Sequence, residues 1–237
     1  MKIISLNCWF HHLSYSALHN RSERLQQICK WLQEQDADMI CLQEVFHMYI
    51  SKMMVGGYLT ASIRDALPDH HTFTHSPCTS SIFDCFQNSG LFFASKQVPS
   101  VFLSHSFRNT WFTRKGFTLA KYDDVIVVNL HLDAFSRTSR AEQIVDLCNE
   151  LHGRQHEIVI CGDWNMPPEE FLCARDRIQL TILKQLYHSP LDVKTHADGC
   201  LDIFVASLPI HNFKVHMEET FSDHFAVSCE VFFENLN

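Results

Sequence analysis

The chain has 237 residues, of which 46% are apolar and 19% charged, and its formal net charge is -8 with 16 histidines counted as neutral. This is the composition of a globular protein long enough to bury a substantial core. The acidic balance disfavours a passive nucleic-acid binder, because such proteins use Lys and Arg to displace counterions from phosphate. It does not exclude an enzyme that holds phosphate through a metal ion.

The 10 cysteines are placed in a way that argues against a disulfide framework. A free cysteine within an apolar periodic run behaves as a small buried hydrophobic residue. Such runs contain Cys8, Cys29, Cys41, Cys148, Cys161 and Cys229. The apolar run at the N-terminus is too short for a signal peptide, and no segment reaches the roughly 18–20 apolar residues of a membrane span. We therefore expect a reducing, cytoplasmic location, or export by a signal-less route.

The first third of the chain predicts a β-α-β unit. Strands are expected at residues 2–8 and 38–44, with a helix over 22–35 in which apolar residues recur at i, i+3, i+4 and i+7. A short helix is expected at 46–57. The segment from about 62 to 88 is the least regular, and such long loops are as commonly disordered as they are functional lids.

The remainder predicts further strands and helices. Three successive strands without crossover helices, which favour antiparallel pairing, are expected at 91–95, 101–103 and 117–122. Later strands are expected at 125–132, 158–165, 201–205 and 225–231, and helices at about 139–152 and 168–187. No repeat and no linker-like change of composition divides the chain, so we expect one domain over residues 1–237.

One stretch, residues 158–165, combines a β-branched apolar run with a polar end. Asp163 and Asn165 follow Gly162 and point the same way if the chain stays extended. At the rim of an α/β sheet such side chains line ligand sites. Asp and Asn before Pro167-Pro168 are equally common as turn formers. The stretch alone leaves both interpretations open.

Other strands also have polar residues at or beside their ends. The whole set comprises Asn7, Gln43-Glu44, Asn129, His131, Asp163, Asn165, Asp202 and Asp223-His224. Each residue alone has an ordinary structural explanation, but their repetition at six segments is harder to dismiss. Hard oxygen ligands and imidazoles without clustered thiols suit Mg²⁺ or Mn²⁺ better than a structural zinc.

These residues resemble the motifs of the endonuclease/exonuclease/phosphatase superfamily. The matching segments follow the family order: Ser5-Leu6-Asn7, Leu42-Gln43-Glu44, Asn129-Leu130-His131, Gly162-Asp163-Trp164-Asn165, Leu201-Asp202-Ile203-Phe204 and Ser222-Asp223-His224. Each motif is short, but together they are specific. Ile203 replaces the usual aromatic residue, and Trp164 stands where Phe is more frequent. The resemblance implies an α/β fold, a four-layered α/β sandwich with two central mostly antiparallel β-sheets flanked by helices.

The resemblance also implies a metal-dependent phosphoric ester hydrolase with one catalytic cleft. Glu44 is expected to be the main carboxylate ligand of Mg²⁺ or Mn²⁺, supported by Asn7 and Asp223. Asp163 is expected to orient or deprotonate the attacking water, with Asn165 beside it.

Two imidazoles complete the catalytic residues that the resemblance implies. His131 is expected to donate to a phosphate oxygen or to assist the leaving group. His224 is expected to be the second catalytic imidazole, with Asp202 as the carboxylate partner that fixes its tautomer and raises its pKa. Whether Asp163 or His224 takes the proton stays open.

The substrate is less well indicated. Lys115-Gly116-Phe117 and Asn88-Ser89-Gly90-Leu91 resemble the sphingomyelinase-like branch, and Lys115 and Asn129 are expected to contact substrate; a plain turn explains Lys115-Gly116 about as well. Phe107, Trp111 and Phe112 are expected to contact lipid, to stack on a base or to lie in the core.

Three hypotheses follow. The first is a Mg²⁺-dependent phosphodiesterase that cleaves a phospholipid, as a sphingomyelinase or phospholipase C does. The second is a nuclease or a nucleotide or inositol-phosphate phosphatase of the same fold, and the third is a catalytically silent binding module. The expected partner is accordingly a phospholipid or a nucleic acid, and the sequence does not indicate an oligomeric state.

Overall fold

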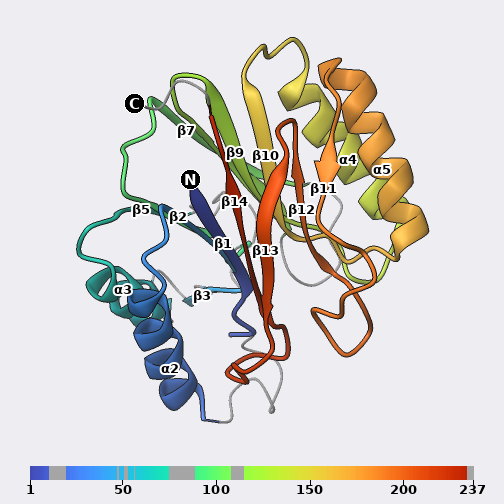
Figure 1. Ribbon diagram of the computed structural model, residues 1–237. Helices are drawn as coiled ribbons and strands as arrows, with labels where there is room; N and C mark the ends of the chain where they lie inside the picture. The colour runs from blue at the N-terminus through green and yellow to red at the C-terminus, as the bar shows by residue number, and fades with distance from the viewer. Residues whose placement is uncertain are drawn as a thin grey trace.

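The computed structural model shows two six-stranded sheets packed face to face, with helices on both outer surfaces (Figure 1). This arrangement confirms the four-layered α/β sandwich predicted from the sequence. The structure describes residues 1–10, 20–46, 48–50, 53–55, 57–74, 89–107 and 115–233.

The first sheet has the strand order β13-β14-β1-β2-β6-β5. Its strands are β1 (Lys2–Asn7), β2 (Met39–Gln43), β5 (His71–Thr74), β6 (Phe92–Ser95), β13 (Ile210–His216) and β14 (Ala226–Val231). Strands β1 and β2 are parallel and are joined by helix α2 (Arg21–Glu34), whereas the other neighbours are antiparallel. The predicted β-α-β unit is therefore present.

The second sheet repeats this plan with the order β11-β12-β10-β9-β8-β7. Its strands are β7 (Val101–Ser106), β8 (Gly116–Lys121), β9 (Val125–His131), β10 (Glu157–Asp163), β11 (Tyr187–His188) and β12 (Asp202–Ala206). Strands β9 and β10 are parallel and are joined by helix α4 (Arg137–Leu151); the other pairs are antiparallel. Each sheet is thus mostly antiparallel with one parallel pair.

Three apolar clusters hold the layers together. Helices α2 and α3 (Gly57–Ala66) cover the first sheet, and helices α4 and α5 (Pro168–Ile182) cover the second (Figure 1). The third cluster lies between the sheets. Ile3 faces this inner cluster and Ile4 faces the helices, so the central strands are buried on both faces. That double burial explains their unbroken apolar runs.

The helix predicted at residues 46–57 is wrong. Strands β3 (Met48–Ile50) and β4 (Met53–Val55) form an antiparallel hairpin there, and helix α3 begins only at Gly57. The run is rich in Met, Tyr, Ile and Val, and the periodicity of so short an apolar run does not distinguish a strand from a helix.

The loop predicted at residues 62–88 is also partly wrong. Its first part contains the end of α3, which buries Leu59 and Ile63 one turn apart, and then the edge strand β5. Strand β5 is paired antiparallel with β6, and this tertiary pairing stabilises a strand of only four residues at the edge of the sheet. Residues 75–88 lie outside the described part of the chain.

Two smaller differences concern the C-terminal third. Strand β13 was not predicted, because it is an edge strand with exposed positions and a shift of register between His211 and Lys214. The helix predicted over 168–187 ends at Ile182. Leu183 adopts the left-handed conformation, with a φ of 55°, and donates its main-chain N–H to Gln179, which ends the helix.

The eight described cysteines are free thiols. Of the six predicted to be buried, only Cys29 is partly exposed. None of the helices in the described residues is long and apolar enough to cross a membrane.

A polar contact joins the two sheets. Asn129 of β9 is fully buried, and its Nδ2 donates to the carbonyl oxygens of Leu42 and Phe92 in the first sheet, at 3.0 Å each. Its Oδ1 accepts a hydrogen bond of 2.8 Å from Nε2 of Gln43. Because buried polar groups without partners are costly, this contact fixes how the sheets pack.

We expect Asn129→Ala to lower the free energy of unfolding by about 2–4 kcal/mol, because it removes a buried donor and a buried acceptor whose partners stay desolvated. Urea denaturation measures the change. Asn149→Ala, at an exposed position of α4, is the matched control and should change stability by no more than about 0.5 kcal/mol. Equal stability of the two variants would show that the contact between the sheets contributes nothing.

Candidate active site

A cleft of about 510 Å³ opens where strands of both sheets end. Eight of the residues predicted for the site line it: Asn7, Glu44, Lys115, His131, Asp163, Asn165, Asp223 and His224. They come from segments as far apart as β1 and the residues before β14. The fold therefore brings together most of the predicted set.

Strand register places the central groups. Asp163 lies beside His131 on the parallel partner strand and beside Asp202 on the antiparallel one. Gly162 has a φ of 140°, and a Cβ built there would lie 1.9 Å from the carbonyl oxygen of Leu130. Only glycine lets strand β10 run this close to its neighbour and still present Asp163 at the rim.

The carboxylate of Asp163 is the centre of the cleft. Its Oδ2 accepts a 3.0 Å hydrogen bond from Nδ2 of Asn7 and lies 3.4 Å from Nε2 of His131 and 3.9 Å from Nε2 of His224. Its Oδ1 accepts from the main-chain N–H of Asn165 at 3.1 Å. Burial would raise the pKa of Asp163, but the charge of His224 and the contact with His131 outweigh it and hold the pKa far below its usual range.

His224 and Asp202 form a buried pair. Nδ1–H of His224 donates to Oδ2 of Asp202 at 2.7 Å, which leaves Nε2 on the cleft side near Asp163. Burial would lower the pKa of His224, but the charges of Asp202 and Asp163 outweigh it and raise this pKa to about 10. His224 therefore carries a positive charge at neutral pH.

Lys115 and His131 form a second buried pair. Nζ of Lys115 lies 2.5 Å from Nε2 of His131 and 3.8 Å from Oε1 of Glu44. Burial lowers the pKa of Lys115, and burial together with the charge of Lys115 lowers the pKa of His131. Both shifts act against two adjacent positive charges, and the pair presents buried nitrogen donors to an anion in the cleft.

The cleft also holds a set of oxygen donors that fits a hard divalent cation. Glu44, Asp223 and Asn7 all line the cleft. Burial raises the pKa of Asp223, and the charge of Glu44 adds to this while His224 opposes it, so a cation here would relieve a charge conflict. Oδ1 of Asn7 accepts from the N–H of Trp9 at 3.0 Å and keeps a second lone pair. Carboxylate and amide oxygens suit Mg²⁺ or Mn²⁺.

Two predicted residues do not line the cleft. Asp202 lies beneath His224 and acts on the cleft through that imidazole. Asn129 is fully buried between the sheets, with all its recorded hydrogen bonds to first-sheet groups. Asn129 does not line the cleft, so its position between the sheets does not support the expected contact with substrate. Their spacing in the sequence indicated that Asn129 and His131 share a face of the strand, but not how far each side chain lies from the cleft.

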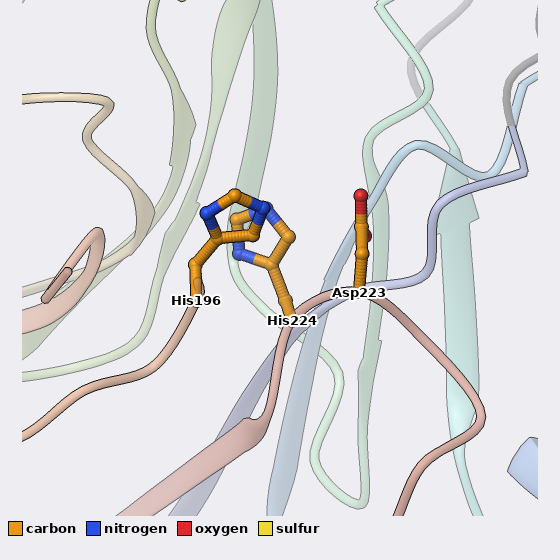
Figure 2. Close-up of side chains that lie close together, drawn as sticks. All are labelled: His196, Asp223 and His224. Carbon is orange, nitrogen blue, oxygen red and sulfur yellow. The ribbon is translucent and has the colours of Figure 1, made fainter. Parts of the chain in front are cut away.

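Several cleft residues were not predicted from the sequence. They are Trp9, Ala134, Phe135, His196, Asp198 and Leu201. Figure 2 shows His196 beside His224 and Asp223, and the two imidazole centroids are 4.5 Å apart. His196 was one histidine among 16, and the turn-forming pair Asp198-Gly199 was the only local sign that the chain turns back there.

The prediction for the three aromatic residues near Lys115 can be compared with the structure at one of them. Phe107 is buried in the core of the second sheet, which is the core placement allowed for at least one of the three. Trp111 and Phe112 lie outside the described residues.

The sequence model of the Endonuclease/Exonuclease/phosphatase family matches residues 4–224. Among curated proteins, no sequence match to this chain is found. Three solved structures are similar over 98% of this chain. An endonuclease/exonuclease/phosphatase family protein from Leptotrichia buccalis has a TM-score of 0.72 and 16% identity, and the mannosyl-6-phosphatase of Bacteroides thetaiotaomicron has a TM-score of 0.71 and 16% identity; each match covers 100% of that chain. Sphingomyelinase C from Streptomyces griseocarneus has a TM-score of 0.67 and 14% identity, and the match covers 99% of its chain.

At these identities the solved structures show the shared fold, and the family match covers nearly the whole chain. Both agree with the resemblance found in the sequence motifs. The chain belongs to the endonuclease/exonuclease/phosphatase family, whose members are generally phosphoester hydrolases.

Proposed function

We propose that this chain is a Mg²⁺- or Mn²⁺-dependent phosphodiesterase. The observation that carries the proposal is the ionised Asp163 carboxylate, held in one cleft between the charged His224 and the Lys115–His131 pair. A negative group that orients water and several positive groups that bind phosphate are what hydrolysis of a phosphoester requires.

Glu44 and Asp223, with Oδ1 of Asn7, would hold the metal ion. When bound, the ion neutralises charge that develops on a phosphate oxygen. The proposal is supported by a solved relative at TM-score 0.68 and 14% identity, the beta toxin of Staphylococcus aureus, whose structure is described with bound magnesium ions.

We assign the orientation of the attacking water to Asp163, whose buried carboxylate stays ionised. His224 already carries a proton at neutral pH, because Asp202 and Asp163 raise its pKa to about 10, although burial opposes this shift. His224 therefore cannot accept another proton and acts as a donor toward the phosphate. Asp163 is ionised and accepts hydrogen bonds. Asn165 is fixed beside it by a 3.0 Å bond from its Nδ2 to the carbonyl of Leu132.

The Lys115–His131 pair lies on the same side of the cleft as Glu44. Its buried N–H groups are placed to donate to a non-bridging oxygen or to the departing oxygen of the substrate. Because both groups are desolvated, such hydrogen bonds are stronger than they would be in water.

An apolar group on the substrate is favoured by the rim of the cleft. Phe135 lines the cleft and is 86% exposed. Its loop is fixed, because Oδ1 of Asp133 accepts the main-chain N–H groups of Phe135 and Ser136 at 2.8 and 2.7 Å. An exposed aromatic ring on a fixed loop beside the proposed phosphate site supports a phospholipid-like substrate, as proposed from the Lys115-Gly116 motif.

A substrate panel tests the proposed function. Purified protein with Mg²⁺ should release phosphocholine or a similar headgroup from sphingomyelin or phosphatidylcholine vesicles, and EDTA should stop the release. Cleavage of DNA, RNA or inositol phosphates in place of lipid would replace the phospholipid assignment by the nuclease or phosphatase alternative. No turnover of any substrate, including bis-p-nitrophenyl phosphate, would leave the catalytically silent binding module.

We expect Asp163→Asn to lower kcat by about 10²–10⁴-fold, because the amide keeps the shape of the side chain but removes the negative charge that orients the attacking water. Steady-state kinetics measures the loss, and thermal unfolding shows that the variant is folded. Asp192→Asn, at an exposed position, is the matched control and should retain wild-type kcat. Unchanged turnover by Asp163→Asn would overturn the role assigned to this carboxylate.

Glu44→Gln should raise the Mg²⁺ concentration that gives half-maximal activity by about 10–100-fold, because it removes a negative charge from the proposed ligand set. Titration of activity with Mg²⁺ gives this value. Glu34→Gln, at an exposed position of α2, should leave it unchanged. A Glu44 variant with the wild-type Mg²⁺ dependence would show that the metal is held elsewhere.

A further inference from the structure

His196 lies in a rigid turn that packs against the strand leading to β14. Its main-chain N–H donates to the carbonyl of Gly199 at 3.0 Å, and the N–H of Gly199 donates back at 3.1 Å. The N–H of Phe225 donates to the carbonyl of Thr195 at 2.7 Å, and Oγ1 of Thr195 accepts the N–H of Asp202 at 3.0 Å. The backbone of His196 therefore has little freedom beside the catalytic pair.

The ring of His196 lies at the cleft beside His224. The rings are 4.5 Å apart with an interplanar angle of 38°, and the side chain of His196 is 18% exposed. Figure 2 shows the two imidazoles one over the other with Asp223 at their side. His196 lines the cleft that the proposed hydrolysis uses.

One hydrogen bond determines which nitrogen of His196 carries the proton. The main-chain N–H of Asp198 donates to Nδ1 of His196 at 3.0 Å, closer than the carboxylate Oδ2 of the same residue, which lies 3.5 Å from Nδ1. Nδ1 therefore supplies a lone pair, and a proton on Nδ1 would face that N–H group directly. The ring proton consequently lies on Nε2, which makes Nε2 a hydrogen-bond donor.

This tautomer argues against the simplest interpretation of the cluster as a metal site. One ligand atom each of His196, Asp223 and His224 lie within 4.8 Å of one another, as three metal ligands would. However, Nδ1 of His196 is already occupied by the Asp198 N–H, and Nε2 holds the proton. Neither nitrogen offers a lone pair to a cation, so His196 is suited to bind an anion instead.

We propose that His196 contacts the substrate, with its Nε2–H donating to a phosphate oxygen held between His196 and His224. This inference rests on the proposed function in one respect, that the substrate carries a phosphate group. His196 supplies an uncharged donor from a fixed turn, on the wall of the cleft that His224 also lines. A donor held in place by the backbone gives the phosphate oxygen a defined position on this wall.

Two substitutions separate binding from structure. In His196→Asn, the amide oxygen replaces Nδ1 and accepts the Asp198 N–H, so the turn is kept but the Nε2 donor is lost. In His196→Gln, the longer amide places an N–H group near the position of Nε2. Both variants are compared with the full-length wild-type protein in Mg²⁺, using inorganic phosphate as the ligand in isothermal titration calorimetry.

We expect phosphate to bind His196→Asn about 10–100-fold more weakly than the wild type, and His196→Gln within a few-fold of it. His211→Ala, at an exposed edge-strand position, is the control and should bind phosphate normally. If His196→Asn binds like the wild type, the ring is only a part of the turn and the proposal fails. Absence of phosphate binding to the wild type would overturn it too.

The tautomer is tested separately by NMR of uniformly ¹⁵N-labelled protein, in which the imidazole nitrogen shifts report the protonated atom. His188 is an internal reference of opposite type, because its Nδ1 lies 2.8 Å from the carbonyl of Ser189 and must donate. His196 should show the proton on Nε2. A proton on Nδ1 of His196 would contradict the proposal, whereas failure of the wild type to hydrolyse any phosphoester would contradict only the proposed function.

Discussion

The structure depends on one buried negative charge, the carboxylate of Asp163. The residue is 1% exposed, and an ionised group in such a place is costly unless donors and opposite charges surround it. Those partners come from both sheets, because Asn7 belongs to β1 of the first sheet and His131 to β9 of the second. Misalignment of the sheets would leave the charge unpaired, so the packing of the sandwich and the chemistry of the cleft are one requirement.

The same requirement explains what the sequence revealed of the site. A polar residue at or beside the end of a doubly buried strand is visible in a sequence, and Glu44, Asp163 and His224 were found in this way. Depth is not visible. Asn129 and His131 alternate on one strand, yet one joins the sheets and the other lines the cleft. His196 was missed because its place depends on main-chain pairing with Gly199 and with His224, which no local pattern indicates.

The fold, like the site, could be predicted only in part from the sequence. The central strands and the helices α2 and α4 have strong periodic patterns, because each contributes to a large apolar layer. The β3–β4 hairpin and the edge strands β5 and β13 have weak patterns, since their conformation comes from one neighbouring strand. The helices and strands that build the core can therefore be predicted from their own sequence, whereas the conformation of the edge elements depends on the strand with which each is paired.

The place of β14 has a consequence for the order of assembly. This strand lies between β1 and β13, and the contact between Met1 and Val231 joins residues 230 positions apart. During synthesis β1 therefore has a bare edge until nearly the whole described chain has been made. Contacts of such sequence separation form late and slowly. Since Asp223 and His224 precede β14 directly, this wall of the cleft is incomplete until β14 has joined the sheet, and the proposed hydrolysis requires that last step of folding.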